Sequence, residues 1–141
     1  MEKKMYPNKT VYIMRGVSGS GKSHEAKMMA FTYNGVVHST DDFFVKNGKY
    51  QFDKEKLKEN HKKNQKAFLK SLKMGIRVVI CDNTNIKLDH MKPYEKMALT
   101  HGYDLVYVTM PHPDPAVAAK NNIHNVPEFV IRKQIEQWEK M

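Results

Sequence analysis

The chain has 141 residues, a formal net charge of +9, one cysteine and no apolar run as long as a membrane span. A chain of this length can bury a sizeable core, so we expect one domain over residues 1–141 and exclude a disulfide-stapled or membrane-spanning protein. Because Lys3 and Lys4 interrupt the start and Cys81 has no partner, we expect an intracellular, cytoplasmic protein without a signal peptide.

The first predicted strand, Thr10–Met14, leads into a glycine-rich loop and then a predicted helix over Gly21–Tyr33. The loop reads GVSGSGKS, a complete P-loop, and its position between strand and helix disfavours a chance glycine-rich turn. Its glycines let backbone N–H groups surround the phosphates of ATP at the positive end of the helix. Lys22 would reach the β- and γ-phosphate oxygens as an exposed charge, and the Ser23 hydroxyl can bind Mg²⁺. The predicted nucleotide-binding residues are Gly16, Val17, Ser18, Gly19, Ser20, Gly21, Lys22, Ser23 and His24.

A second short strand is predicted over Gly35–Ser39, and two aspartates, Asp41 and Asp42, follow it. This strand should end at the same edge of the sheet as the P-loop. A carboxylate at that edge can accept the proton of an attacking hydroxyl and orient the hydroxyl toward the γ-phosphate. Because aspartate is also a favoured helix cap, we predict Asp41 as the catalytic base and Asp42 as a cap or a supporting residue.

The sequence after these aspartates is polar and rich in lysine. Residues Lys46–Asp53 are predicted as a loop with an Asn-Gly turn, and Lys54–Lys73 as a helix with one apolar stripe. The helix carries Lys54, Lys56, Lys58, Lys62, Lys63, Lys66, Lys70 and Lys73. These lysines are either a solvated surface or a positive rim that follows a polynucleotide backbone, with Tyr50 or Phe44 stacking on a base.

The third predicted strand, Ile76–Cys81, is almost wholly apolar, which indicates the middle of a parallel sheet and an inert, buried Cys81. Asp82 follows directly and could receive the Ser23 hydroxyl or a water bound to Mg²⁺. The next residues, Asn83, Thr84 and Asn85, could donate hydrogen bonds to an acceptor substrate. The same DNTN sequence is also a good turn between strand and helix, so both interpretations stay open.

The remaining elements complete an alternating β-α order. The expected ones are a helix over Leu88–His101, a strand over Tyr103–Met110 and two helices over Pro115–Asn122 and Pro127–Lys140. This order predicts a three-layer α/β fold of the P-loop NTPase type, adenylate-kinase-like, with a mainly parallel central sheet of four to five strands. Ligands should bind at the carboxyl ends of the strands.

The segment between the last two helices is where a lid would close over the nucleotide. A cation in such a lid would offset the charge that develops on the transferred phosphoryl group. The candidates are Lys120, His124 and Arg132, and among them we predict His124 as a catalytic residue, with an ordinary surface histidine as the alternative.

The motifs together resemble a known family. In chain order, GVSGSGKS, STDDFF, YQFD, VVICDNTN, MKPYEKMA, GYDL and NNIHNVPEFVIRKQIEQWE resemble the P-loop kinase domain of the Nedd-binding-protein type, which is similar to the bacteriophage polynucleotide 5′-kinase domain. The resemblance covers about residues 10–139. Many NTPases share the P-loop, so the specific signal is STDD, DNTN and NIHNVP together. The resemblance implies Asp41 as general base, with Lys22 and Ser23 acting from the P-loop.

Two positions depart from the phage-type pattern. Phe44 stands where the phage-type enzyme has an arginine that contacts substrate phosphate, and His124 falls on or near its lid arginine, a histidine that the Nedd-binding type shares. We expect ATP- and Mg²⁺-dependent phosphoryl transfer to a hydroxyl, with a nucleic acid bearing a 5′-OH end as partner. The alternatives are a small-molecule kinase for a nucleoside or sugar, and a nucleotide-gated nucleic-acid-binding adaptor without turnover.

Overall fold

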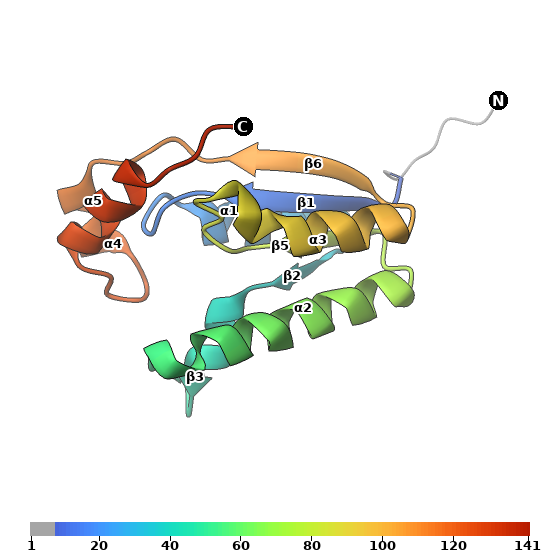
Figure 1. The fold of residues 1–141 in the computed structure, drawn as a ribbon, viewed down its shortest axis with the longest axis horizontal. Coiled ribbons are helices and arrows are strands. Elements are labelled where there is room, and N and C mark those ends of the chain that lie inside the picture. Colours follow the sequence, from blue (N-terminus) through green and yellow to red (C-terminus); the bar gives the residue numbers. More distant parts are fainter. Residues whose placement is uncertain (1–7) are drawn as a thin grey trace.

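Four parallel strands form the central sheet of the computed structural model, which describes residues 8–141 (Figure 1). In spatial order the strands are β2 (Val36–His38), β5 (Val78–Cys81), β1 (Thr10–Arg15) and β6 (Asp104–Thr109). Every neighbouring pair is parallel. The predicted α/β fold with a parallel sheet is therefore confirmed, with four strands. The expectation placed on Lys3 and Lys4 lies outside the described residues.

The helices also follow the predicted order. They are α1 (Lys22–Tyr33), α2 (Leu57–Lys73), α3 (Leu88–Thr100), α4 (Pro115–Asn121) and α5 (Glu128–Glu136), with short 3₁₀ turns η1 (Thr40–Phe44) and η2 (Lys54–Lys56). Figure 1 shows α4 and α5 at the end of the sheet toward which β6 points, which is the carboxyl end of the strands. None of the helices within residues 8–141 is both long and apolar enough to cross a membrane.

The polar stretch predicted as a loop is instead a small hairpin. Strands β3 (Val45–Lys46) and β4 (Lys49–Tyr50) pair antiparallel. Asn47 and Gly48 turn between them with φ angles of 52° and 76°, the left-handed pair that a two-residue hairpin turn requires. The sequence identified the turn but not the strands, because each strand has only two residues and is too short to show the alternation of polar and apolar residues that marks a strand.

The two faces of the sheet bury different helices. On β1, Val11 and Ile13 face a core that Phe68 of α2 and Tyr94 of α3 complete. The alternate residue Met14 faces Ala26 of α1 on the opposite side. This alternation follows from the two-residue period of a strand and gives three layers, as predicted. Cys81 is fully buried in this core, as expected.

The buried stripe of α2 differs from the apolar stripe that the sequence suggested. Besides Ser71, the buried residues of α2 are four that follow one another at a spacing of four, namely Asn60, Asn64, Phe68 and Leu72. Two of these four are polar, and the Asn64 amide donates to the Tyr94 hydroxyl at 2.8 Å. A helix face is set by its 3.6-residue period, so the two asparagines lie on the core side despite their polarity.

Candidate active site

The P-loop follows β1 and is held open by its backbone and by α5. Gly19 and Gly21 have φ angles of 80° and 86°, a left-handed conformation that residues with a Cβ rarely adopt. A Cβ on Gly19 would also lie only 2.7 Å from the backbone oxygen of Ala118 in α4. At the tip, the Ser18 N–H donates to Gln134 Oε1 at 2.9 Å, and Gln134 Nε2 donates to the Ser18 hydroxyl at 3.2 Å. The loop conformation is therefore fixed by contacts from both terminal helices.

Lys22 opens α1 and makes a buried ion pair. Its Nζ lies 2.5 Å from Oδ1 of Asp82, and the two residues are 8% and 4% exposed. Lys22 is thus not the exposed charge that the sequence suggested. Because β5 pairs with β1 in parallel, its carboxyl end brings Asp82 beside the P-loop, where the two charges compensate each other. Asp82 accepts a bond from Lys22 at Oδ1, and the structure shows no bond between Asp82 and Ser23 among the described residues.

Asp41 lies across the mouth of the site and is held by two aromatic rings. The Tyr50 hydroxyl donates to its Oδ1 at 3.2 Å, and His124 Nε2 lies 3.5 Å from its Oδ2. The rings of Tyr50 and His124 stack with centroids 4.0 Å apart. Burial, reinforced by the Asp41 carboxylate, raises the pKa of Tyr50, so this phenol stays protonated and donates. The structure thus brings the two predicted catalytic residues, Asp41 and His124, into one cluster.

Sequence reasoning missed Tyr50 as part of this cluster and considered it only for base stacking. The hairpin returns Tyr50 opposite Val45, four residues after Asp41. The Asn-Gly turn was the available signal, because a two-residue turn between residues 46 and 49 sets this register.

Asp42 is not a helix cap. It lies inside η1, whose cap residue Ser39 makes no side-chain cap bond. Burial raises the pKa of Asp42, and the carboxylates of Asp82 and Asp41 raise it further, while Lys27 lowers it. Asp42 therefore lies within electrostatic range of both Asp41 and Asp82.

The residues at the P-loop fit a nucleotide with Mg²⁺. The Ser20 hydroxyl oxygen is buried and has no hydrogen-bond partner among the described residues, as expected of a group that contacts a ligand. No three His, Cys, Asp or Glu side chains within residues 8–141 come close enough to hold a metal by themselves. Mg²⁺ typically needs only one or two protein groups beside waters and substrate phosphates, and Ser23 and Asp82 could supply them.

A cavity of about 700 Å³ opens beside Asp41. Its walls come from distant segments, including His61 of α2, His90 of α3 and His124 of the last loop. Burial, and the neighbouring His90, lower the pKa of His61, which keeps that ring neutral near pH 7. None of the described residues that line this cavity is a lysine or an arginine. The lining therefore combines carboxylates and histidines with uncharged groups and holds neither a lysine nor an arginine.

The amides after β5 serve the fold as well as the cavity. Asn83 accepts from the Thr40 N–H at 3.0 Å and donates to the Tyr94 hydroxyl at 3.3 Å. Asn85 is 1% exposed and donates to the Met14 carbonyl at 2.7 Å. Both residues line the cavity, but these bonds occupy the groups proposed for contacts with an acceptor, which favours the turn interpretation of DNTN.

The other predicted cations lie away from the phosphates. Arg132 pairs with Glu128 on the exposed side of α5, with 2.9 Å between Nε and Oε2, and Lys120 is exposed at the end of α4. Arg15, next to the P-loop, is 1% exposed and donates to the carbonyls of Asn85, Ile86 and Glu139, with its guanidinium 4.3 Å from the Trp138 ring. Of the three predicted lid cations, only His124 contacts the site.

The lysines of α2 point away from the cavity. The helix presents Leu57, His61 and Gln65 to the cavity, at a spacing of four residues. Lys58, Lys62 and Lys66, which follow each of them by one position, are exposed. The surface interpretation therefore describes these lysines better than a rim along the acceptor cavity.

Comparison with known proteins agrees with this geometry. The family model described as an AAA domain matches residues 11–141. NEDD4-binding protein 2 of Homo sapiens is 34% identical over 146 residues, a match that covers 99% of this chain. A putative bifunctional polynucleotide kinase/RNA ligase of Autographa californica nuclear polyhedrosis virus is 32% identical over 114 residues, covering 71% of this chain.

Solved structures share the fold. A chain in the structure of the Pnkp1/Rnl/Hen1 RNA repair complex superposes with a TM-score of 0.68 at 20% identity, over 97% of this chain and 46% of that chain. The sequence relatives are much longer, since this chain spans 8% of NEDD4-binding protein 2 and 16% of the viral protein.

Proposed function

Because this chain belongs to the AAA-domain family of P-loop kinases, we propose that it transfers the γ-phosphoryl group of ATP to the 5′-hydroxyl of a polynucleotide. The acceptor oxygen forms a bond to the γ-phosphorus as the bond to the bridging oxygen breaks, and ADP leaves. Asp41 takes the proton from the acceptor hydroxyl. Tyr50 and His124 hold the Asp41 carboxylate in position for that transfer.

On the nucleotide side, the P-loop N–H groups would bind the phosphates at the start of α1. Lys22 would leave Asp82 and contact the β- and γ-phosphate oxygens, which frees the Asp82 carboxylate. Mg²⁺, when bound, would neutralise charge on the β- and γ-phosphates. Ser23 and Asp82 are the residues that would hold it.

One observation carries the proposal. Asp41 lines the large cavity together with Ser18 of the P-loop and with Asn83, the residue after Asp82, so its carboxylate shares that cavity with the phosphate-binding loop. The carboxylates of Asp82 and Asp41 both raise the pKa of Asp42, so the three groups lie within electrostatic range of one another. A base between donor and acceptor is the arrangement that phosphoryl transfer requires.

A small-molecule kinase is the second candidate. The absence of lysine and arginine from the described lining of the cavity favours a neutral acceptor such as a nucleoside. The cavity of about 700 Å³ lies within the range of small-molecule pockets.

The test is incubation of the protein with γ-labelled ATP and a matched panel of acceptors. The panel contains 5′-OH DNA and RNA oligonucleotides, the corresponding nucleosides, and sugars. Labelling of oligonucleotides at kcat/KM well above that of the nucleosides supports the proposal. Labelling of nucleosides or sugars alone selects the small-molecule kinase, and tight ATP binding without any labelled product selects the adaptor.

A further inference from the structure

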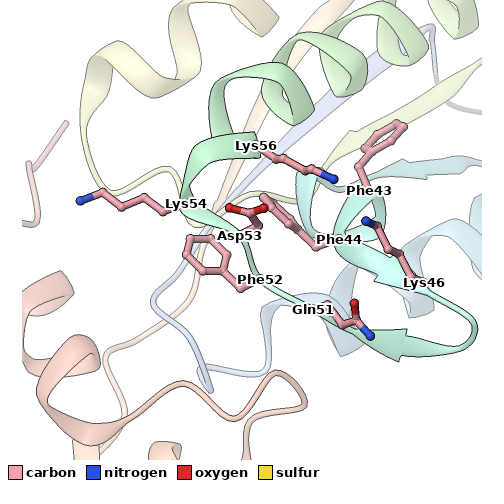
Figure 2. Close-up of a pocket in the computed structure, with 8 residues that line it drawn as sticks. All are labelled: Phe43, Phe44, Lys46, Gln51, Phe52, Asp53, Lys54 and Lys56. Carbon is pink, nitrogen blue, oxygen red and sulfur yellow. The ribbon is translucent and has the colours of Figure 1, made fainter.

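A second hollow, of about 390 Å³, lies between the β3–β4 hairpin and the start of α2 (Figure 2). Phe44 lies at its base and is 2% exposed, and it contacts Phe52 with ring centroids 5.1 Å apart. Lys46 of the hairpin and Lys56 of η2 stand on its rim. The hollow therefore combines an aromatic surface with cations from two different elements.

The two lysines point at each other. Figure 2 shows the ammonium ends of Lys46 and Lys56 converging, whereas Lys54 points away. The nearby Lys56 ammonium lowers the pKa of Lys46. Neither lysine forms an ion pair with a carboxylate in the part of the chain that the structure describes. Asp53 lines the same hollow, and its charge partly offsets the effect of Lys56 on the pKa of Lys46. Its carboxylate also accepts a bond from the Glu55 N–H at 3.0 Å and so caps η2.

The lining of the hollow holds three lysines against the single carboxylate of Asp53, so the two converging ammonium groups still repel each other, and an anion between them reduces that repulsion. Phosphate oxygens suit this arrangement because each ammonium offers donors to a different oxygen. The aromatic rings beside the lysines can in addition stack on a nucleobase or cover a sugar face.

Phe52 connects this hollow with the acceptor cavity, since its side chain lines both. Its ring is 56% exposed and stands between the cavity near Asp41 and the lysine pair. A strand that places its terminal nucleoside in the large cavity would therefore pass Phe52 and bring its next phosphate to the lysines.

We propose that Lys46 and Lys56 form a subsite for the first internucleotide phosphate of the acceptor strand, on the 3′ side of the nucleoside that is phosphorylated. This inference rests on the proposed function and deepens it. The large cavity, which holds no lysine or arginine, receives the nucleoside, and the lysine pair distinguishes a strand from a free nucleoside. The net positive charge of the acceptor site thus lies one nucleotide away from the reacting hydroxyl.

The test compares two double variants with equal loss of charge. Lys46→Gln/Lys56→Gln removes the proposed subsite, and Lys62→Gln/Lys66→Gln removes two exposed α2 lysines that line neither cavity. Fluorescence anisotropy measures the Kd of a labelled 5′-OH trinucleotide, and circular dichroism with ATP binding checks the fold. We expect the first variant to bind roughly tenfold more weakly, and its salt slope to fall by about 0.7, while the control changes little.

A second arm uses the unmodified protein. A trinucleotide whose first linkage is an uncharged methylphosphonate should bind as weakly as the natural trinucleotide binds to Lys46→Gln/Lys56→Gln. The same modification at the second linkage should have a smaller effect. Equal binding of both modified strands and the natural one would overturn the subsite, as would equal losses in the two double variants.

These outcomes separate the subsite from the proposed function. If Lys46→Gln/Lys56→Gln changes neither the labelling nor the binding of the oligonucleotide, the subsite proposal is refuted and the proposed kinase activity stands. The protein could instead label no acceptor and yet bind strands in a way that depends on the lysine pair and on the first phosphate. That result would support the subsite and refute the proposed kinase activity.

Discussion

The nucleotide side and the acceptor side of the site differ in how their charge is arranged. On the nucleotide side, Lys22 and Asp82 are nearly inaccessible and paired, and the surrounding loop is a run of adjacent residues. On the acceptor side, Asp41 and His124 keep side-chain exposures of 41% and 23%, and the cavity walls come from segments far apart in the chain. The P-loop groups are adjacent in the chain, although Asp82 and the terminal helices hold them in place, whereas the cavity walls exist only where distant segments pack together.

The largest expected effect tests the nucleotide side. Lys22→Ala should reduce phosphoryl transfer by about 10³-fold, because the main cation at the β- and γ-phosphates is lost. It should also cost on the order of 3 kcal/mol in the free energy of unfolding, because Asp82 is left buried without its partner. Transfer rates with the acceptor panel and urea denaturation measure the two effects.

The matched control is Lys22→Ala/Asp82→Ala, which should regain most of the lost stability without regaining activity. Near wild-type turnover in Lys22→Ala would contradict the assignment of this loop as the donor site.

The second prediction separates the two aspartates on the acceptor side. Asp41→Asn keeps the shape of the side chain but removes the proton acceptor, so kcat should fall by about 10²-fold or more. Asp42→Asn should lower kcat much less, because the contacts from the Tyr50 hydroxyl and from His124 go to the Asp41 carboxylate. Equal losses of kcat in the two variants would show that the base is shared or misassigned.

A smaller effect is expected from the residue that positions the base. Tyr50→Phe keeps the ring that stacks on His124 but removes the hydroxyl that donates to Asp41. We expect kcat to fall by about five- to tenfold with little change in the KM for ATP. A rise in the acceptor KM with unchanged kcat would instead mean that Tyr50 binds the acceptor and does not position the base.

The fourth prediction concerns stability and pH. Burial raises the pKa of Asp42 above its ordinary value, so the folded state favours the protonated form. Ionised Asp42 then costs stability, and this cost appears as the pH rises through the range between the unfolded and the folded pKa. Asp42→Asn should therefore raise the Tm by about 1–2 °C at pH 7 and have no such effect below pH 3.5.

Melting curves of both proteins at the two pH values measure the difference. A lower Tm of Asp42→Asn at pH 7 would support the helix-cap role suggested by the sequence.

The smallest effect is expected from the exposed side of α2. Replacing Lys62, Lys63 and Lys66 together by Gln should change acceptor affinity by less than about twofold at physiological salt, because these side chains point into solvent. A large decrease in affinity would mean that the acceptor strand runs over α2 and not past the hairpin.

Much of the fold and the centre of the site could be predicted from the sequence. The P-loop and the aspartates after β2 and β5 could be found because each depends on residues that are adjacent in the chain. The spacing of apolar residues in the strands and helices predicted the layers of the fold. Because parallel strands end at one edge of the sheet, the sequence also predicted that Asp41 and Asp82 lie at the same edge. The Asn-Gly turn was also found, although the hairpin around it was not.

Only the tertiary structure decided how these local pieces meet. Lys22 bonds to Asp82, which lies 60 residues further along the chain, and the Ser18 N–H donates to Gln134, which lies 116 residues further along. The tertiary structure also turned the lysines of α2 outward and left Lys46 and Lys56 facing each other. Spacing along a sequence fixes which residues share a strand or a helix face. Partners in distant segments depend on how those faces pack, and no local pattern contains that information.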